Sequence, residues 1–258
     1  MSHRPLALVT GVGRRAGIGA AIAARLATDG WDLAISWWGP YDVRVHGAAD
    51  PDGVDSVVAE CEHAGARVTR LPVDLADPEQ AAALVGRAEA EAGAPVTAIV
   101  MSHCESVDSD FATTTLESFD RHMAVNVRAP FLLVQAYAAR LRAGAPAVED
   151  RRRVIALTSD HVAFNLPYGT SKGALDRLIV GAAQELADVH VSANLVNPGP
   201  NDTGWMTEEI RQSAIAQTPG GRPSMPNDTA ALVGFLCGPD GGWVNGQLLK
   251  SDGGFSAK

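Results

Sequence analysis

A tyrosine and a lysine four residues apart, in Tyr168-Gly-Thr-Ser-Lys172, have the spacing of a catalytic acid–base pair. On a helix this spacing puts both side chains on one face, about 5–6 Å apart at Cβ. An ammonium beside a phenol favours the phenolate, and so lowers a tyrosine pKa that is otherwise near about 10. Such a tyrosine can exchange a proton near neutral pH. The same pair could also be two residues on a solvated helix, so the interpretation depends on the rest of the chain.

A glycine-rich segment at residues 10–19, Thr10-Gly-Val-Gly-Arg-Arg-Ala-Gly-Ile-Gly19, joins an expected strand at 6–10 to an expected helix at 17–28. Glycines let the backbone turn tightly and approach a pyrophosphate, which then lies at the positive end of the helix. A glycine-rich turn that binds nothing is the alternative. The residues expected to contact the cofactor here are Gly11, Gly13, Arg14, Arg15, Gly17, Ile18 and Gly19.

The end of the second expected strand, residues 33–37, bears on the choice of dinucleotide. An acidic residue there would bind the free ribose hydroxyls and repel a 2′-phosphate. The sequence has Ser36 followed by two tryptophans, with no carboxylate until Asp42. Arg14 and Arg15 could pair with a phosphate through their planar guanidinium groups, or could simply be solvated. NADP(H) is therefore favoured as the cofactor, and NAD(H) remains possible.

Short apolar runs alternate with longer amphipathic segments, which indicates repeated β-α units. We therefore expect one α/β domain over residues 1–258, a Rossmann-type doubly wound parallel sheet with helices on both faces. Strands are expected at 6–10, 33–37, 68–73, 96–102, 153–158, 189–196 and 247–250. Helices are expected at 17–28, 54–64, 78–91, 116–141 with a kink at Pro130, 168–186, 208–216 and 229–236.

Two connections are unusual. Residues 38–53 form a long, turn-rich link, and such links are usually functional or disordered. We expect this one to lie over the adenosine end of the cofactor. Residues 198–226 are rich in Pro, Gly, Asn and Thr and are expected to form a mobile lid over the substrate. Trp205 and Met206 could give that lid an apolar surface, or could pack against the domain.

Composition excludes several classes of protein. A net charge of −9 argues against nucleic-acid binding, and Arg151–Arg153 is the one dense basic cluster, expected to be a solvated loop. The three cysteines, at 61, 104 and 237, fit neither a disulfide framework nor a metal site. The N-terminus lacks the apolar core of a signal peptide, and no uninterrupted apolar run is long enough to cross a bilayer. These features predict a cytoplasmic protein with no membrane partner and no metal.

Together the glycine-rich loop and the Tyr-x-x-x-Lys pair resemble the short-chain dehydrogenase/reductase family, and the match spans nearly the whole chain. Residues 244–247 followed by Asp252-Gly-Gly are similar to the family's C-terminal signature. The closest resemblance is to the 3-oxoacyl-thioester reductase-like members. By this resemblance Lys172 also holds the nicotinamide ribose, and Tyr168 contacts the cofactor.

The resemblance assigns further residues. Asp74, with Leu75, would contact the adenine, and Asn126 would hold a water beside the catalytic lysine. Pro198 and Gly199 match the family's segment after the sixth strand, in which Thr203 would contact the nicotinamide carboxamide. Each has a simpler alternative: a strand-end turn residue for Asp74, a solvent-facing polar residue for Asn126, and a helix cap for Thr203.

Three features depart from the family pattern. The glycine loop is two residues longer than usual if it starts at Thr10. The family's Asn-Asn-Ala-Gly is replaced by Met101-Ser-His-Cys104, which leaves Ser102 as the expected cofactor contact and makes His103 either a satisfied loop residue or a contact to the ribose. The serine before the tyrosine, Ser159, is nine positions away instead of thirteen. Nine residues span up to roughly 30 Å, so Ser159 can still reach the tyrosine; Thr158 or His161 could replace it.

These residues lead to a functional hypothesis. We expect an NADP(H)-dependent oxidoreductase that moves a hydride between the nicotinamide and a ketone or secondary alcohol, for instance a 3-oxoacyl thioester. Its catalytic residues would be Asn126, Ser159, Tyr168 and Lys172. The alternative is a non-catalytic NADP(H)-binding regulator or sensor. An enoyl reductase is disfavoured because such relatives space the tyrosine and lysine further apart. The resemblance also implies a homo-oligomer, a tetramer or a dimer, formed through the apolar faces of 131–137 and 175–183.

Overall fold

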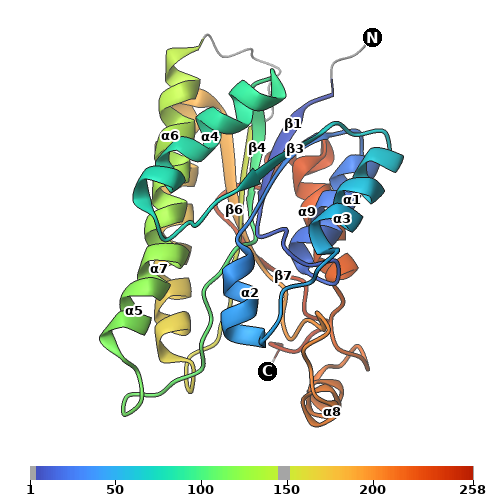
Figure 1. Cartoon of the computed structure of the whole chain (residues 1–258), viewed down its shortest axis with the longest axis vertical. Helices are drawn as coiled ribbons and strands as arrows, with labels where there is room; N and C mark the ends of the chain where they lie inside the picture. Colours follow the sequence, from blue (N-terminus) through green and yellow to red (C-terminus); the bar gives the residue numbers. More distant parts are fainter. Residues whose placement is uncertain (1–3, 145–151, 258) are drawn as a thin grey trace.

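The computed structural model describes residues 4–144 and 152–257. Across these residues seven parallel strands form one sheet in the order β3-β2-β1-β4-β5-β6-β7 (Figure 1). The strands are β1 (Leu6–Thr10), β2 (Asp32–Trp37), β3 (Val68–Pro72), β4 (Val96–Met101), β5 (Arg152–Leu157), β6 (Val191–Asn197) and β7 (Leu248–Lys250). The predicted α/β class and Rossmann-type topology are confirmed.

Helices cover both faces of the sheet (Figure 1). One face packs against α1 (Ile18–Thr28), α3 (Gly53–His63) and α9 (Pro226–Cys237). The other packs against α4 (Pro78–Ala92), α6 (Ala129–Ala143) and α7 (Leu166–Glu185). The remaining helical segments are α2 (Gly39–His46), α5 (Leu116–Met123), α8 (Glu208–Gln217) and the short turns η1 (Ala124–Arg128), η2 (Ala187–Val189) and η3 (Asp240–Trp243). Because both faces are covered, strands such as β1 are buried along their whole length. No helix in the described residues has the length and apolarity needed to cross a bilayer.

The strand order positions the site. From β1 the chain continues to β2 and β3 on one side, and from β4 onward it continues on the other side. This reversal leaves a crevice at the carboxyl ends of β1 and β4, where ligands of open α/β sheets bind. The loops that follow β1, β2, β3, β4 and β6 all meet at this edge.

The predicted helix over 116–141 is interrupted. It consists of α5, one π-helical turn at Ala124–Arg128, and α6, in which Pro130 occupies the first turn. Proline has no N–H to donate to the carbonyl of Asn126, four residues earlier, so a regular α-helix cannot continue through this point. The wider turn absorbs the defect and carries Asn126 on its inner side, where it is buried.

The connection at 38–53 differs from the predicted loop. It contains α2, which begins with Gly39 and Pro40 and ends at Gly47 in the left-handed conformation (φ 80°). Proline in a first helical turn and glycine just past the last turn are the usual helix boundaries, so the composition that suggested a loop in fact delimits a short helix.

The prediction of a solvated arginine cluster is wrong for the two residues that the structure describes. Arg152 and Arg153 lie in β5 and are buried, while Arg151 is outside the described residues. Arg152 donates to the carbonyl of Val189, and Arg153 donates to that of Leu236. Backbone carbonyls at the ends of neighbouring elements therefore compensate for the desolvation of these guanidinium groups.

Candidate active site

A cavity of about 520 Å³ occupies the crevice at the carboxyl edge of the sheet. Most of the residues predicted to bind a cofactor line it: Gly11, Gly13, Arg14, Gly17, Ile18, Gly19, Ser36, Asp74, Leu75, Ser102, Tyr168, Pro198, Gly199 and Thr203. Arg15 and Lys172 are not among the residues that line it. Arg15 is exposed on the outer side of the loop, where its backbone N–H donates to Asp50 (3.1 Å), and Lys172 is buried.

The phosphate loop has the close backbone packing that a dinucleotide needs. Gly11 has a φ of +78°, and a Cβ there would lie 2.7 Å from the backbone nitrogen of His103. A Cβ on Gly19 would lie 2.5 Å from the carbonyl oxygen of Gly11. In the described residues no side chain caps the N-terminus of α1, and its first turn has no acidic residue. This helix end is suited to an anion.

Ser36, at the end of β2, is a second observation that fits a ligand. Its hydroxyl is buried and has no hydrogen-bond partner among the described residues, and the residue lines the cavity. Leaving a buried hydroxyl unpaired costs free energy, so a polar ligand atom is its natural partner. Together, the glycine cradle and this hydroxyl fit a dinucleotide.

Arg14 has more partners than the sequence suggested. Its guanidinium donates to the carbonyl of Thr203 (2.6 Å), lies 4.6 Å from the ring centroid of Trp205, and is 3.9 Å from the carboxylate of Asp42. The lid residues Thr203 and Trp205 are thus tied to the phosphate loop. Asp42 also lines the cavity, although it lies five residues after the end of β2 and the sequence analysis gave its carboxylate no part in the choice of cofactor. Arg14 offsets the negative charge of this carboxylate.

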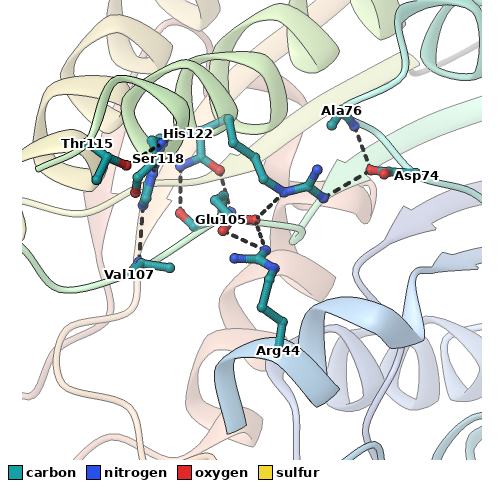
Figure 2. A network of polar contacts seen from close by, with 10 residues as sticks. Arg44, Asp74, Ala76, Glu105, Val107, Thr115, Ser118 and His122 are labelled. Atoms are coloured by element: carbon teal, nitrogen blue, oxygen red, sulfur yellow. Dashed lines mark hydrogen bonds and ion pairs between the residues drawn. The ribbon is translucent and has the colours of Figure 1, made fainter. Parts of the chain in front are cut away.

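A network of charged side chains that includes Asp74 lines one part of the cavity (Figure 2). Glu105 is 2% exposed and receives two hydrogen bonds from Arg44 (2.7 and 2.7 Å) and one from Arg121 (3.2 Å). Arg121 also reaches Asp74 (3.3 Å), which accepts a further bond from the backbone N–H of Ala76. Asp74 is therefore more than a turn residue, because it links β3 to α5.

The histidine after β4 is a satisfied loop residue. His103 is buried, its Nδ1 lies 2.6 Å from the hydroxyl of Thr10, and its Nε2 lies 3.1 Å from the carbonyl of Val125. A carbonyl can only accept, so Nε2 carries the proton and Nδ1 accepts from Thr10. Burial, assisted by the charge of Lys172, lowers the pKa of His103 to about 3, which keeps the ring neutral. Of the two interpretations open from the sequence, the structure favours this one.

Tyr168 and Lys172 lie in the first two turns of α7. The Lys172 ammonium donates to the carbonyl of Leu157 (2.8 Å) and lies 5.5 Å from the ring centroid of Tyr168. Burial raises the pKa of Tyr168 above its ordinary value, and a hydrogen bond with Ser159 only partly opposes this. Burial, and not the expected effect of Lys172, therefore decides the direction in which the pKa of Tyr168 shifts. The phenol is held in its protonated form.

Ser159 keeps its place beside the tyrosine in spite of the shortened loop. Its hydroxyl bonds with Tyr168 and accepts from the backbone N–H of His161 (3.1 Å). Thr158, the first alternative, points elsewhere, because its hydroxyl donates to Asp176 (2.5 Å). His161, the second alternative, is exposed, with its ring centroid 6.5 Å from that of Tyr168.

Asn126 is buried and does not face solvent. Its amide nitrogen donates to the carbonyl of Glu105 (2.8 Å) and to the hydroxyl of Ser171 (2.9 Å), and its oxygen accepts from the backbone N–H of Glu105 (2.7 Å). Its side chain therefore clamps the loop after β4 against α7. The role in holding a water, which the resemblance implied for this residue, stays a prediction.

The lid contains α8, as the predicted helix over 208–216 required, and the cap of this helix is Thr207, whose hydroxyl accepts from the N–H of Ile210 (3.2 Å). Thr203 is thus not a cap, and it lines the cavity instead. Beyond the predicted set, cavity residues include Trp37, Trp38, Tyr41, Asp42, Cys104, Glu105, Ser106, Arg121, Asn201 and Trp205. The Gly39-Pro40 pair, which starts a helix after β2, was the sequence signal that could have revealed Trp37, Trp38, Tyr41 and Asp42.

Comparisons with known proteins agree with this geometry. A family model described as enoyl-(acyl carrier protein) reductase matches residues 11–256. The uncharacterized oxidoreductase YjdA of Bacillus subtilis is 31% identical over 261 residues, covering 99% of each chain. A chloroplastic NADPH-dependent aldehyde reductase-like protein of Arabidopsis thaliana is 33% identical over 267 residues, covering 97% of this chain and 93% of that protein.

Solved structures give the same result. A short chain dehydrogenase from Burkholderia cenocepacia, crystallised in complex with NADP, superposes with a TM-score of 0.84 at 30% identity and 98% coverage of both chains. The site and these relatives define an oxidoreductase on a Rossmann-type fold. The chain belongs to the short-chain dehydrogenase/reductase family, as its motifs predicted. The regulator alternative gains no support from these relatives, whose names describe oxidoreductases and reductases.

Proposed function

We propose that this protein transfers a hydride between NADP(H) and a carbonyl or secondary alcohol substrate. The observation that carries the proposal is the phenol of Tyr168, which lines the dinucleotide crevice, is held protonated by burial, and is hydrogen-bonded to Ser159. A protonated acid at this place is what carbonyl reduction needs, because the carbonyl oxygen must gain a proton as the carbon gains a hydride.

The same proposal names NADP(H) as the preferred cofactor. The unpartnered hydroxyl of Ser36 lies at the end of β2, where the adenosine ribose binds in this fold, and Arg14 of the phosphate loop lines the same cavity. Asp42 would repel a 2′-phosphate, so Arg14 has to offset its charge for NADP(H) to be preferred over NAD(H). The names of the Arabidopsis relative and of the Burkholderia complex support this preference.

When bound, the nicotinamide supplies the hydride, and the protein's own groups supply the remainder of the chemistry. Tyr168 gives its proton to the carbonyl oxygen. Ser159 accepts from the N–H of His161, so its own hydroxyl proton is available to stabilise negative charge on that oxygen. Lys172 stabilises the phenolate that proton transfer leaves behind, because its ammonium lies 5.5 Å from the ring. Asn126 positions the loop after β4 through Glu105.

Apolar side chains beside the catalytic groups favour an apolar substrate, such as a ketone or a 3-oxoacyl thioester. Phe164 and Val162 are 80% and 79% exposed on the loop between Ser159 and α7, and Trp205 is 46% exposed on the lid. The loop is tied to the one after β4, since Asn165 donates to Ser106 (3.0 Å). Apolar groups exposed around a cleft are typical of a binding site.

The test is NADPH oxidation with aldehydes, ketones and 3-oxoacyl thioesters in the wild type and in Tyr168→Phe. We expect the variant to lose at least about a hundredfold in kcat, because a positioned general acid contributes at least that factor, while NADPH affinity persists. Tyr137→Phe is the matched control. Its hydroxyl donates to Thr97 in the core, far from the cavity, so this variant should keep its turnover.

Two results would contradict the proposal. One is a near-normal turnover in Tyr168→Phe. The other is oxidation of NADPH with 2-enoyl thioesters only, which would fit the description of the matching family model better than carbonyl reduction does. The spacing of Tyr168 and Lys172 favours carbonyl reduction.

We further propose that the protein forms a homo-oligomer through the α5–α7 side. A groove of about 550 Å³ there is lined by Met123, Val127, Phe131 and Leu178, among others, and Phe131 is 48% exposed. The faces named from the sequence contribute only in part, since Tyr137 is buried in the core. Light scattering on the purified protein should give a mass of two or four chains, and a single-chain mass would contradict the proposal.

A further inference from the structure

Helix α2 lies across the dinucleotide crevice. It follows β2, yet Arg44 and Tyr41 contact the loop that follows β4, on the other side of β1. To make these contacts the helix has to pass over the carboxyl end of β1, where the phosphate loop begins. Figure 1 shows α2 beneath this edge of the sheet, between the α5–α7 side and α8.

Side chains along the segment hold it in place. The strongest contact is the double hydrogen bond from Arg44 to the buried carboxylate of Glu105 (Figure 2). Tyr41 is hydrogen-bonded to the thiol of Cys104. At the start of the segment, the guanidinium of Arg121 lies 4.6 Å from the ring centroid of Trp38. These contacts come from two separate elements, the β4 loop and α5.

The helix covers the cavity without filling it. Trp38, Tyr41 and Asp42 line the cavity together with the phosphate loop and Tyr168, so the space for a dinucleotide lies between α2 and the sheet edge. On the outer side, Val43 is 53% exposed. A glycine stands at each end of the helix, Gly39 and Gly47, and residues without a Cβ can absorb the changes in φ and ψ that a hinge needs.

We propose that residues 38–52 form a strap that closes the cofactor site and must open to admit and release NADP(H), with Arg44 as the positioning residue that latches it to Glu105. Trp38 and Tyr41 are then cofactor-contacting residues supplied by this strap. The inference rests on the proposed function for the identity of the cofactor. It goes beyond that function because it assigns the rates of cofactor exchange to α2.

The latch can be weakened without leaving a buried charge unpaired. In Arg44→Ala the Glu105 carboxylate keeps Arg121 (3.2 Å) as a partner, so the variant should fold. Arg44→Lys keeps the charge but loses the planar fork that makes both hydrogen bonds. Arg142→Ala is the matched control, because it removes a half-exposed arginine that pairs with Asp188 on the far side of the domain.

The experiment measures NADPH association and dissociation by stopped-flow fluorescence in the four proteins. In Arg44→Ala we expect both rate constants to rise about threefold to tenfold, the range set by a partly exposed ion pair with a buried carboxylate. Arg44→Lys should be intermediate, and Arg142→Ala should match the wild type. Unchanged rate constants in Arg44→Ala would overturn the proposal that residues 38–52 act as a strap. An increase in the association rate constant alone would mean that α2 blocks the empty site but does not cover bound NADPH, and this result would also overturn the proposal.

Limited proteolysis with thermolysin gives a readout that does not depend on turnover. Arg44→Ala should be cut within residues 38–52 faster than the wild type, and NADPH should protect both proteins. Equal cleavage of the two proteins without NADPH would overturn the latch. If the wild type fails to bind NADPH, the proposed cofactor is wrong, while cleavage without NADPH still tests the latch independently.

Discussion

The neutral histidine after β4 should make the protein sensitive to acid. His103 is buried, and burial lowers its pKa from 6.5 to about 3 in the folded state. Protonation would place a charge on this buried ring and would reverse its bond with Thr10, because Nδ1 would then have to donate to the hydroxyl. In the unfolded chain the ring is solvated and titrates near 6.5. The folded state therefore binds fewer protons than the unfolded state between these two values.

The size and sign of the effect follow from linkage. Where the unfolded state binds more protons, the free energy of unfolding rises with pH, so stability is lost as the pH falls below about 6.5. Each pH unit in this window is worth about 1.4 kcal/mol, so at pH 5 the contribution of His103 amounts to a loss of about 2 kcal/mol. The loss continues to grow down to a pH of about 3.

The assay is urea unfolding at pH 7.5 and pH 5 in the wild type and in His103→Gln, whose amide can accept from Thr10 and donate to Val125 without titrating. The wild type should lose about 2 kcal/mol more than the variant between these two pH values. His63→Gln, at an exposed position, is the control and should follow the wild type. If His103→Gln loses as much stability as the wild type, His103 is not held neutral, and the argument from its two hydrogen bonds is wrong.

Two further predictions concern the walls of the site. Gly19→Ala places a Cβ 2.5 Å from the carbonyl oxygen of Gly11, so the phosphate loop must move, and NADPH affinity in a fluorescence titration should fall at least about tenfold; an unchanged affinity would contradict the cradle. Asn126→Ala removes three buried hydrogen bonds and should lower the free energy of unfolding by roughly 2–4 kcal/mol, together with kcat. Denaturant unfolding and NADPH oxidation measure these two effects, and a stable, fully active variant would show that the clamp on Glu105 is dispensable.

Local patterns were sufficient to predict much of the site. Glycines at 11, 17 and 19 between a strand and a helix placed the phosphate loop, because a tight turn and a close backbone approach depend on nearby residues alone. The spacing of Tyr168 and Lys172 placed both on one face of α7 for the same reason. The sequence also predicted that Ser159 lies beside Tyr168, even though the loop between them is shorter than in the family pattern.

Predictions from the sequence were wrong or incomplete where contacts between distant segments decide the outcome. The charges of Arg152 and Arg153 suggested solvent, but carbonyls of Val189 and Leu236, far along the chain, satisfy them inside the domain. The pKa of Tyr168 was expected to fall because of Lys172, yet it rises because the fold buries the phenol. Arg14 was expected either to pair with a phosphate or to be solvated, but its guanidinium also donates to the carbonyl of Thr203 in the lid.

The amino-acid sequence by itself determined the order of the strands and of the helices that cover the sheet, the family, the phosphate loop and the placement of Tyr168 beside Lys172, because these follow from periodicity, glycine positions and spacing within one element. Only the tertiary structure decided the protonation of Tyr168 and His103, the pairing of Glu105 with Arg44 and Arg121, and the course of α2 across the crevice. Desolvation and ion pairing depend on which side chains meet in space. Residues 61 positions apart, as Arg44 and Glu105 are, come into contact only through the tertiary structure.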